Sequence, residues 1–105
     1  IFFEVEKMAA LLKELIGKNT VVIFAWESCP YCQRAKALLT GLSKDVAYLN
    51  LQTMPNGDAI HQAIIAQTNH ETVPAIYIRQ QFKGGFSDVD GLHRSGQLVP
   101  LLTGS

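Results

Sequence analysis

Two cysteines, Cys29 and Cys32, are the whole thiol content of this 105-residue chain. A disulfide between them would close so short a loop that it removes little chain entropy from the unfolded protein, which argues against a structural role. Two buried structural cysteines are a second interpretation, but they seldom take this spacing. A zinc site is a third, but the chain has no second C-x-x-C, and His61 and His70 lack the usual ligand spacing. The pattern therefore favours a pair that reacts with other disulfides.

The position of Cys29 predicts an ionised sulfur. If a helix begins at Pro30, a residue suited to the first helical position, the free N–H groups and the positive end of the helix dipole face that sulfur. Such positions lower the pKa of a free cysteine from about 8.5 to roughly 3.5–7.5. Cys32, on the helix side of Ala35 and Leu39, should be more buried and keep a higher pKa. We expect Cys29 to attack a disulfide and Cys32 to resolve the mixed disulfide that forms.

Hydrophobic periodicity predicts the elements that position this pair. A β-branched, apolar run predicts a central buried strand directly before the cysteines. Ser87 and Asp90 resemble a capping box at the start of a late helix. The segment 79–81 lacks the Asn-Gly turn that would determine the register of the last hairpin. The expected elements are a helix ending at Gly17, a strand over 20–26, a helix from Pro30 to 41–43, a strand over 45–51, a turn at 53–58, a helix to about Asn69, a strand over 75–78, its partner ending over 82–86, a short helix after Ser87 and a last turn over Leu98, Leu101 and Leu102.

The order α-β-α-β-α-β-β-α predicts an α/β fold with a four-stranded mixed sheet flanked by helices. A C-x-x-C at the junction between the first strand and its helix is the placement of a thioredoxin-like fold. A length of 105 residues predicts a single domain over 1–105.

Composition argues against several classes of function. The formal net charge is zero and Lys and Arg do not cluster, so we expect no nucleic-acid partner. Apolar residues make up 48% of the chain, but no run is long enough to span a bilayer. We expect a monomer in the cytoplasm. Because the chain begins at Ile1 and not at Met, removal of a targeting segment, and thus an organellar location, stays open.

Three motifs follow one another along the chain: "CPYC" at 29–32, "TVPAIYI" at 72–78 and "GGFSD" at 84–88. Together they resemble the dithiol, CPYC-type glutaredoxins. The resemblance implies a thiol–disulfide oxidoreductase that reduces mixed disulfides and protein disulfides. It implies no intrinsic cofactor or metal, with glutathione or trypanothione as the cosubstrate. The implied partners are low-molecular-weight thiols and disulfide-bonded or glutathionylated proteins.

The resemblance also implies roles for residues outside the dithiol. Pro74 would be a cis-proline that exposes the Val73 backbone, which could pair with a glutathionyl cysteine like an added strand. Ser87 and Asp88, at a helix start, would hold the γ-glutamyl end of the thiol. Simpler roles stay open: Ser87 as a mere cap, Tyr31 as a mere cover of the helix start, and the TVP segment as a mere start of a strand. The implied thiol-binding residues are Tyr31, Thr72, Val73, Pro74, Gly85, Ser87 and Asp88.

Three positions depart from the family pattern. Trp26 stands where a lysine usually meets the glycine carboxylate of glutathione, His61 replaces a glutamine, and Glu71 replaces a basic or polar residue. Lys83 or Arg34 could instead bind this carboxylate in place of the lysine. The sharper hypothesis is a thiol without that carboxylate, such as trypanothione, whose amidated spermidine end is cationic. The segments "FAWESCPYC" and "HETVPA" also resemble dithiol glutaredoxins of trypanosomatids.

Two other functions stay open. Some glutaredoxins bridge a [2Fe–2S] cluster between two subunits through the first cysteine and a bound thiol, although a proline after that cysteine disfavours this. A thioredoxin-type protein served directly by a flavoprotein reductase is the third possibility.

Overall fold

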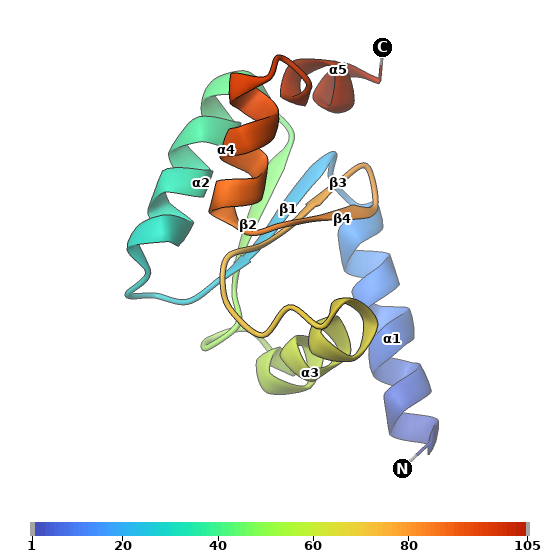
Figure 1. The fold of residues 1–105 in the computed structure, drawn as a ribbon. Coiled ribbons are helices and arrows are strands. Elements are labelled where there is room, and N and C mark those ends of the chain that lie inside the picture. The colour runs from blue at the N-terminus through green and yellow to red at the C-terminus, as the bar shows by residue number, and fades with distance from the viewer. Residues whose placement is uncertain (1, 105) are drawn as a thin grey trace.

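Four strands form one mixed sheet in the order β2-β1-β3-β4 (Figure 1). The computed structural model describes residues 2–104, with side chains from Glu4 onward. Strand β1 (Val21–Ala25) pairs in parallel with β2 (Val46–Asn50) and antiparallel with β3 (Ala75–Ile78). Strand β3 pairs antiparallel with β4 (Gln81–Gly84). The predicted thioredoxin-like α/β fold is confirmed.

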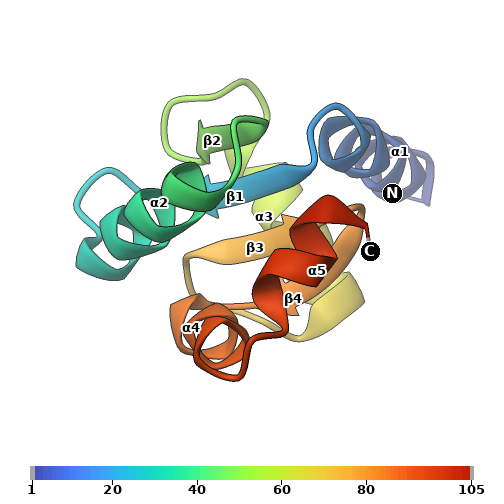
Figure 2. The ribbon, with the colours of Figure 1, turned by 90° about the horizontal axis from the view of Figure 1, so that it is seen from above.

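Helices cover both faces of this sheet. Helices α1 (Phe2–Gly17) and α3 (Gly57–Thr68) lie on one face, and α2 (Pro30–Leu42) and α4 (Phe86–Arg94) lie on the other (Figure 1). The short helix α5 (Leu98–Thr103) follows α4 and packs on the same side as α2 and α4 (Figure 2). Among residues 2–104, no helix combines the length and the apolar character that crossing a membrane requires.

The central strand β1 divides the core into two clusters. Val21, Ile23 and Ala25 pack toward α2, α4 and α5, whereas Val22 and Phe24 pack toward α1 and α3. Every residue of β1 is buried, because helices cover both faces of the sheet at this strand. This explains why the sequence of the strand is continuously apolar and does not alternate between apolar and polar residues.

The start of α4 differs from the prediction. The N-cap is Gly85, in an extended conformation, and its N–H donates a 3.0 Å hydrogen bond to Asp88 Oδ2. The helix therefore begins at Phe86, which we had expected to end the last strand. The proposed cap at Ser87 is wrong because Ser87 already lies within the first helical turn, so Asp88 satisfies the N-cap amide.

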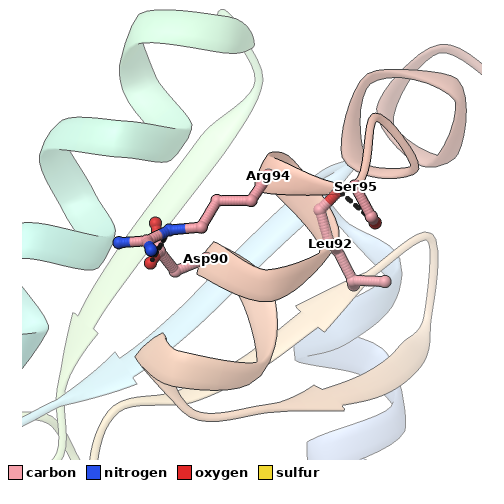
Figure 3. Close-up of polar contacts among 4 residues, drawn as sticks. All are labelled: Asp90, Leu92, Arg94 and Ser95. Atoms are coloured by element: carbon pink, nitrogen blue, oxygen red, sulfur yellow. Dashed lines mark hydrogen bonds and ion pairs between the residues drawn. The ribbon is translucent and has the colours of Figure 1, made fainter.

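Asp90, the other half of the predicted capping box, also has a different role. Its Oδ2 lies 2.9 Å from Arg94 Nε, an ion pair between residues one helical turn apart (Figure 3). Ser95 follows the helix, and its hydroxyl donates to the Leu92 carbonyl at 3.1 Å. Asp90 thus stabilises the second half of α4 and not its beginning.

The β3–β4 hairpin closes through Arg79 and Gln80. Both residues have positive φ, 50° and 70°, as in the two-residue type I′ turns that usually contain Asn-Gly. The Arg79 N–H donates to the Thr20 carbonyl at 2.7 Å. A tight turn therefore forms without the residues that favour it, with a register irregularity between Ile76 and Tyr77.

Candidate active site

The two cysteines lie at the beginning of α2. Cys29 is the N-cap, with φ −129° and ψ 102°, and Pro30 is the first helical residue, as predicted. The cysteines form a disulfide with a Cα–Cα distance of 5.1 Å. The Cys32 N–H also donates to Cys29 Sγ at 3.1 Å. Cys32 is fully buried whereas Cys29 is partly exposed, which is the asymmetry that the sequence predicted.

A cis-proline turn lies against the dithiol. The Val73–Pro74 peptide bond is cis, as the family resemblance implied. The Val73 carbonyl oxygen is 3.9 Å from Cys29 Sγ, although 44 residues separate the two in sequence. The fold thus brings the main chain of Val73 next to the partly exposed sulfur.

A pocket of about 290 Å³ extends from this turn to the start of α4. The residues that the resemblance implied for thiol binding, from Tyr31 to Asp88, all line it. His70 and Phe86 complete its wall. The sequence thus predicted a set of residues that the fold does gather around one pocket.

No pattern in the sequence marks His70 or Phe86 as a pocket residue. His70 Nε2 lies 3.1 Å from the Pro74 carbonyl oxygen and 3.3 Å from Thr72 Oγ1. The Phe86 ring packs on Tyr31, with centroids 6.1 Å apart and planes tilted by 31°. Phe86 stands inside the "GGFSD" motif and His70 only two residues before the TVP motif. Proximity to a motif was therefore the one available signal.

The two glycines before α4 shape the end of the pocket. Gly84 has φ +101°, a conformation that L-residues with side chains rarely adopt. A Cβ atom at Gly84 would collide with the Asp88 carboxylate, whose Cγ would lie only 2.7 Å away. Gly84 therefore lets Asp88 reach back and bind the Gly85 N–H.

The three residues that depart from the family pattern lie together. The Trp26 and His61 rings meet edge to face, with centroids 5.7 Å apart. His61 Nε2 is 3.1 Å from the main-chain oxygen of Glu71. Trp26 is 38% exposed, and the Glu71 side chain is also exposed. These residues do not line the 290 Å³ pocket, so they form a separate group, which we call the Trp26 cluster.

Two cations were candidates to replace the missing lysine. Arg34 lies over the Tyr31 ring, with its guanidinium carbon 5.4 Å from the ring centroid. Lys83, which is partly buried on strand β4, donates from Nζ to Gln81 Oε1 at 3.3 Å. Arg34 thus lies beside a residue of the pocket, whereas Lys83 contacts its own strand.

A partly exposed cysteine at a helix N-terminus, a buried partner one turn on and a facing cis-proline define a thiol–disulfide protein of the thioredoxin-like fold. Comparisons with known proteins narrow this class. The glutaredoxin family model matches residues 21–83. A glutaredoxin of Ricinus communis is 40% identical over 91 residues, which cover 87% of this chain and 89% of the relative.

Solved structures agree with the sequence match. The buckwheat glutaredoxin–glutathione complex superposes with a TM-score of 0.92 at 32% identity, covering 99% of this chain and 94% of that one. The dithiolic glutaredoxin 2-C-Grx1 of Trypanosoma brucei brucei superposes with a TM-score of 0.82 at 41% identity, covering 87% of this chain and 94% of that one. The chain belongs to the glutaredoxin family and is a thiol–disulfide oxidoreductase. Curated relatives include proteins named as chloroplastic and as mitochondrial, so the cytoplasmic location stays a prediction.

Proposed function

We propose that this protein reduces glutathione-type mixed disulfides and protein disulfides, with Cys29 as the nucleophile and Cys32 as the resolving thiol. The observation that supports this best is the 3.1 Å hydrogen bond from the Cys32 N–H to Cys29 Sγ. In the reduced protein, an amide directed at this sulfur stabilises a thiolate more than a thiol, and the helix dipole acts in the same direction. The thiolate is the form that attacks disulfides.

The reaction proceeds by two thiol–disulfide exchanges. The Cys29 thiolate attacks the glutathionyl sulfur of a mixed disulfide, a Cys29–glutathione disulfide forms, and the other thiolate leaves and takes a proton. A second glutathione thiolate attacks the glutathionyl sulfur, which yields glutathione disulfide and regenerates the Cys29 thiolate. With a protein disulfide, Cys29 attacks one sulfur of the substrate, and the other substrate sulfur leaves as a thiolate and takes a proton. Cys32 then attacks Cys29 in this mixed disulfide, so the Cys29–substrate bond breaks and the Cys29–Cys32 disulfide forms. The reduced protein leaves, and two low-molecular-weight thiols supply the electrons that reopen the Cys29–Cys32 disulfide.

The pocket fits an extended thiol peptide beside Cys29. The Val73 main chain can pair with the backbone of a glutathionyl cysteine, as an added strand pairs with a sheet edge. The N-terminal turn of α4 offers free amides to the γ-glutamyl carboxylate. Asp88 uses Oδ2 to cap the helix and presents its negative charge to the γ-glutamyl ammonium. The glutathione complex of the buckwheat relative supports this class of ligand.

The Trp26 cluster suggests which thiol is preferred. An exposed indole and an exposed carboxylate at Glu71 would attract a cationic group and repel the free glycine carboxylate of glutathione. Trypanothione is amidated at that carboxylate and carries one secondary ammonium group in its spermidine bridge. We therefore propose that the protein prefers trypanothione. The similarity to a trypanosome glutaredoxin is compatible with this preference.

Turnover of a glutathionylated peptide and of a protein disulfide tests the roles of the cysteines. Cys29→Ser should abolish both activities, because the attacking sulfur is gone. Cys32→Ser should retain reduction of the mixed disulfide and lose reduction of the protein disulfide. In Cys32→Ser, iodoacetamide should alkylate Cys29 rapidly below about pH 7. Turnover by Cys29→Ser, or slow alkylation at that pH, would refute the assignment.

Glu71→Arg tests the thiol preference. The substitution should shift the ratio of kcat/KM for trypanothione over kcat/KM for glutathione toward glutathione by about tenfold, as for a reversed charge near a surface site. Glu14→Arg on α1 changes the net charge equally at an exposed position outside the site, and it should leave the ratio unchanged. An equal shift in both variants would mean that net charge alone steers the thiol.

Several finer expectations stay predictions. No observation on residues 2–104 favours the iron–sulfur alternative or a flavoprotein reductase as the electron donor. The protein substrates and the monomeric state likewise stay predictions. Absorbance after anaerobic purification and coupled assays with each electron donor would address the first two.

A further inference from the structure

His70 occupies a half-buried position between the two walls of the pocket. Its Nε2 is 3.1 Å from the Pro74 carbonyl oxygen and 3.3 Å from Thr72 Oγ1. Its ring packs against Phe82 of β4, with centroids 5.2 Å apart. A Cβ atom added to Gly85 would lie 3.4 Å from His70 Cε1, so the ring also lies against the main chain that leads into α4. His70 therefore contacts both the cis-proline turn and the opposite side of the pocket.

The hydrogen bond from His70 satisfies the Pro74 carbonyl, which lies beyond the last residue pair of the β3–β4 ladder. The last β3–β4 pair joins Ile76 to Gly84, after which the chain turns into α4. Pro74 lies beyond this pair and is buried, so its carbonyl needs a donor from elsewhere. The carbonyl can only accept, so Nε2 carries the hydrogen in this bond. The neutral Nε2–H tautomer and the imidazolium both provide that hydrogen, so the bond does not require a charged ring.

The same bond restrains the residue that faces the nucleophile. A contact between residues 70 and 74 closes a short loop that contains Val73, whose carbonyl oxygen lies 3.9 Å from Cys29 Sγ. Small shifts of this peptide would misalign the groups that pair with a thiol substrate. We infer that His70 is a positioning residue, whose Nε2–H holds the Val73–Pro74 main chain in the geometry that binds the glutathionyl backbone. This inference rests on the proposed function, in which Val73 pairs with the thiol.

Two substitutions separate the hydrogen bond from ring packing. His70→Phe keeps a ring beside Phe82 and removes the donor, whereas His70→Gln places an amide N–H near the position of Nε2 and removes the ring. We expect His70→Phe to raise KM for a glutathionylated peptide about fivefold with kcat nearly unchanged, as for the loss of one neutral hydrogen bond in binding. His70→Gln should restore KM nearly to the wild-type value. The rate of Cys29 alkylation should be the same in all variants.

His93→Phe is the matched control, because His93 is exposed on α4 outside the pocket. It should leave KM unchanged, and urea unfolding of each variant identifies any that is unfolded. If His70→Phe does not fold, His70→Leu takes its place. A wild-type KM in the donorless variant, or an equal rise in His70→Gln, would overturn the inference. If the wild-type protein itself does not turn over the glutathionylated peptide, the proposed function fails and the inference falls with it.

Discussion

Replacing Gly84 by alanine should destabilise the protein and disrupt the start of α4 at once. Gly84 has φ +101°, and an added Cβ would lie 2.7 Å from Asp88 Cγ and in collision with Oδ2. The Asp88 side chain would have to move, and it would then lose its 3.0 Å hydrogen bond from the Gly85 N–H. Backbone strain and the lost cap therefore act together.

The expected cost follows from three contributions. A non-glycine residue in a sparsely populated conformation costs about 1–3 kcal/mol. Loss of the Gly85–Asp88 hydrogen bond costs about 1 kcal/mol. The smaller conformational entropy of alanine in the unfolded chain offsets about 0.5–1 kcal/mol of this. We expect Gly84→Ala to lower the free energy of unfolding by about 1–3.5 kcal/mol.

Urea unfolding of the oxidised protein, followed by circular dichroism, measures this change. Gly91→Ala is the matched control, because Gly91 lies within α4 and a Cβ there meets no atom within 4 Å. In that variant the free energy of unfolding should rise by about 0.5–1 kcal/mol, since alanine is more favourable than glycine inside a helix. Asp88→Ala removes the carboxylate, so Gly84→Ala in that background should cost about 1 kcal/mol less than in the wild type.

Two outcomes would refute this reasoning. If Gly84→Ala leaves the free energy of unfolding unchanged or raises it, as Gly91→Ala should, the positive φ does not restrain the position. If the effects of Gly84→Ala and Asp88→Ala simply add, the carboxylate is not what the new Cβ displaces.

Three further changes test other features of the fold by the same measurement. Burial raises the pKa of Tyr77 to about 12, and its hydroxyl has no hydrogen-bond partner among residues 2–104, so Tyr77→Phe should stabilise the protein by about 1 kcal/mol; a lower urea midpoint would contradict this. Gln80→Gly should raise the free energy of unfolding by about 1 kcal/mol, because glycine adopts the φ of 70° in the hairpin turn without strain. An unchanged urea midpoint would argue against strain at this position. Hydrogen bonds from the Thr20 backbone, the Thr20 hydroxyl and Asn19 lower the pKa of Asp45 below its ordinary value of 3.8, so Asp45 stabilises the fold above that pH and less as the pH falls through its lowered pKa. Asp45→Asn should therefore be less stable than the wild type at neutral pH, and the difference in stability should shrink in acid. A difference that does not depend on pH would mean that the charge of Asp45 is not its cause.

Short-range patterns were sufficient for most of the architecture. The apolar run of β1, the helical spacing before Gly17 and the C-P-Y-C start of α2 each depend on neighbours within one or two turns of chain. The same is true of the cysteine asymmetry, because the position of Cys32 one turn after Cys29 determines which sulfur is buried. These features were predicted correctly because local periodicity and helix-end chemistry cause them.

The cap of α4 and the hairpin turn show where local patterns fail. Ser87 with Asp90 has the right spacing for a capping box, but so does Gly85 with Asp88. The end of β4 decides between them, since the chain must leave the sheet at Gly84 before a helix can begin. Similarly, Arg79 adopts a left-handed conformation that its residue type does not favour, because strand pairing on both sides requires a tight turn.

The sequence by itself determined the reactive pair, its helix, the succession of helices and strands along the chain and the family motifs, since each depends on contiguous residues. Only the tertiary structure decided that Val73 faces Cys29, that His70 joins both walls of the pocket and that Trp26, His61 and Glu71 form one group. These contacts join segments that are distant in sequence or lie in irregular loops. Their geometry depends on how the sheet aligns the ends of its strands, which no local pattern of residues encodes.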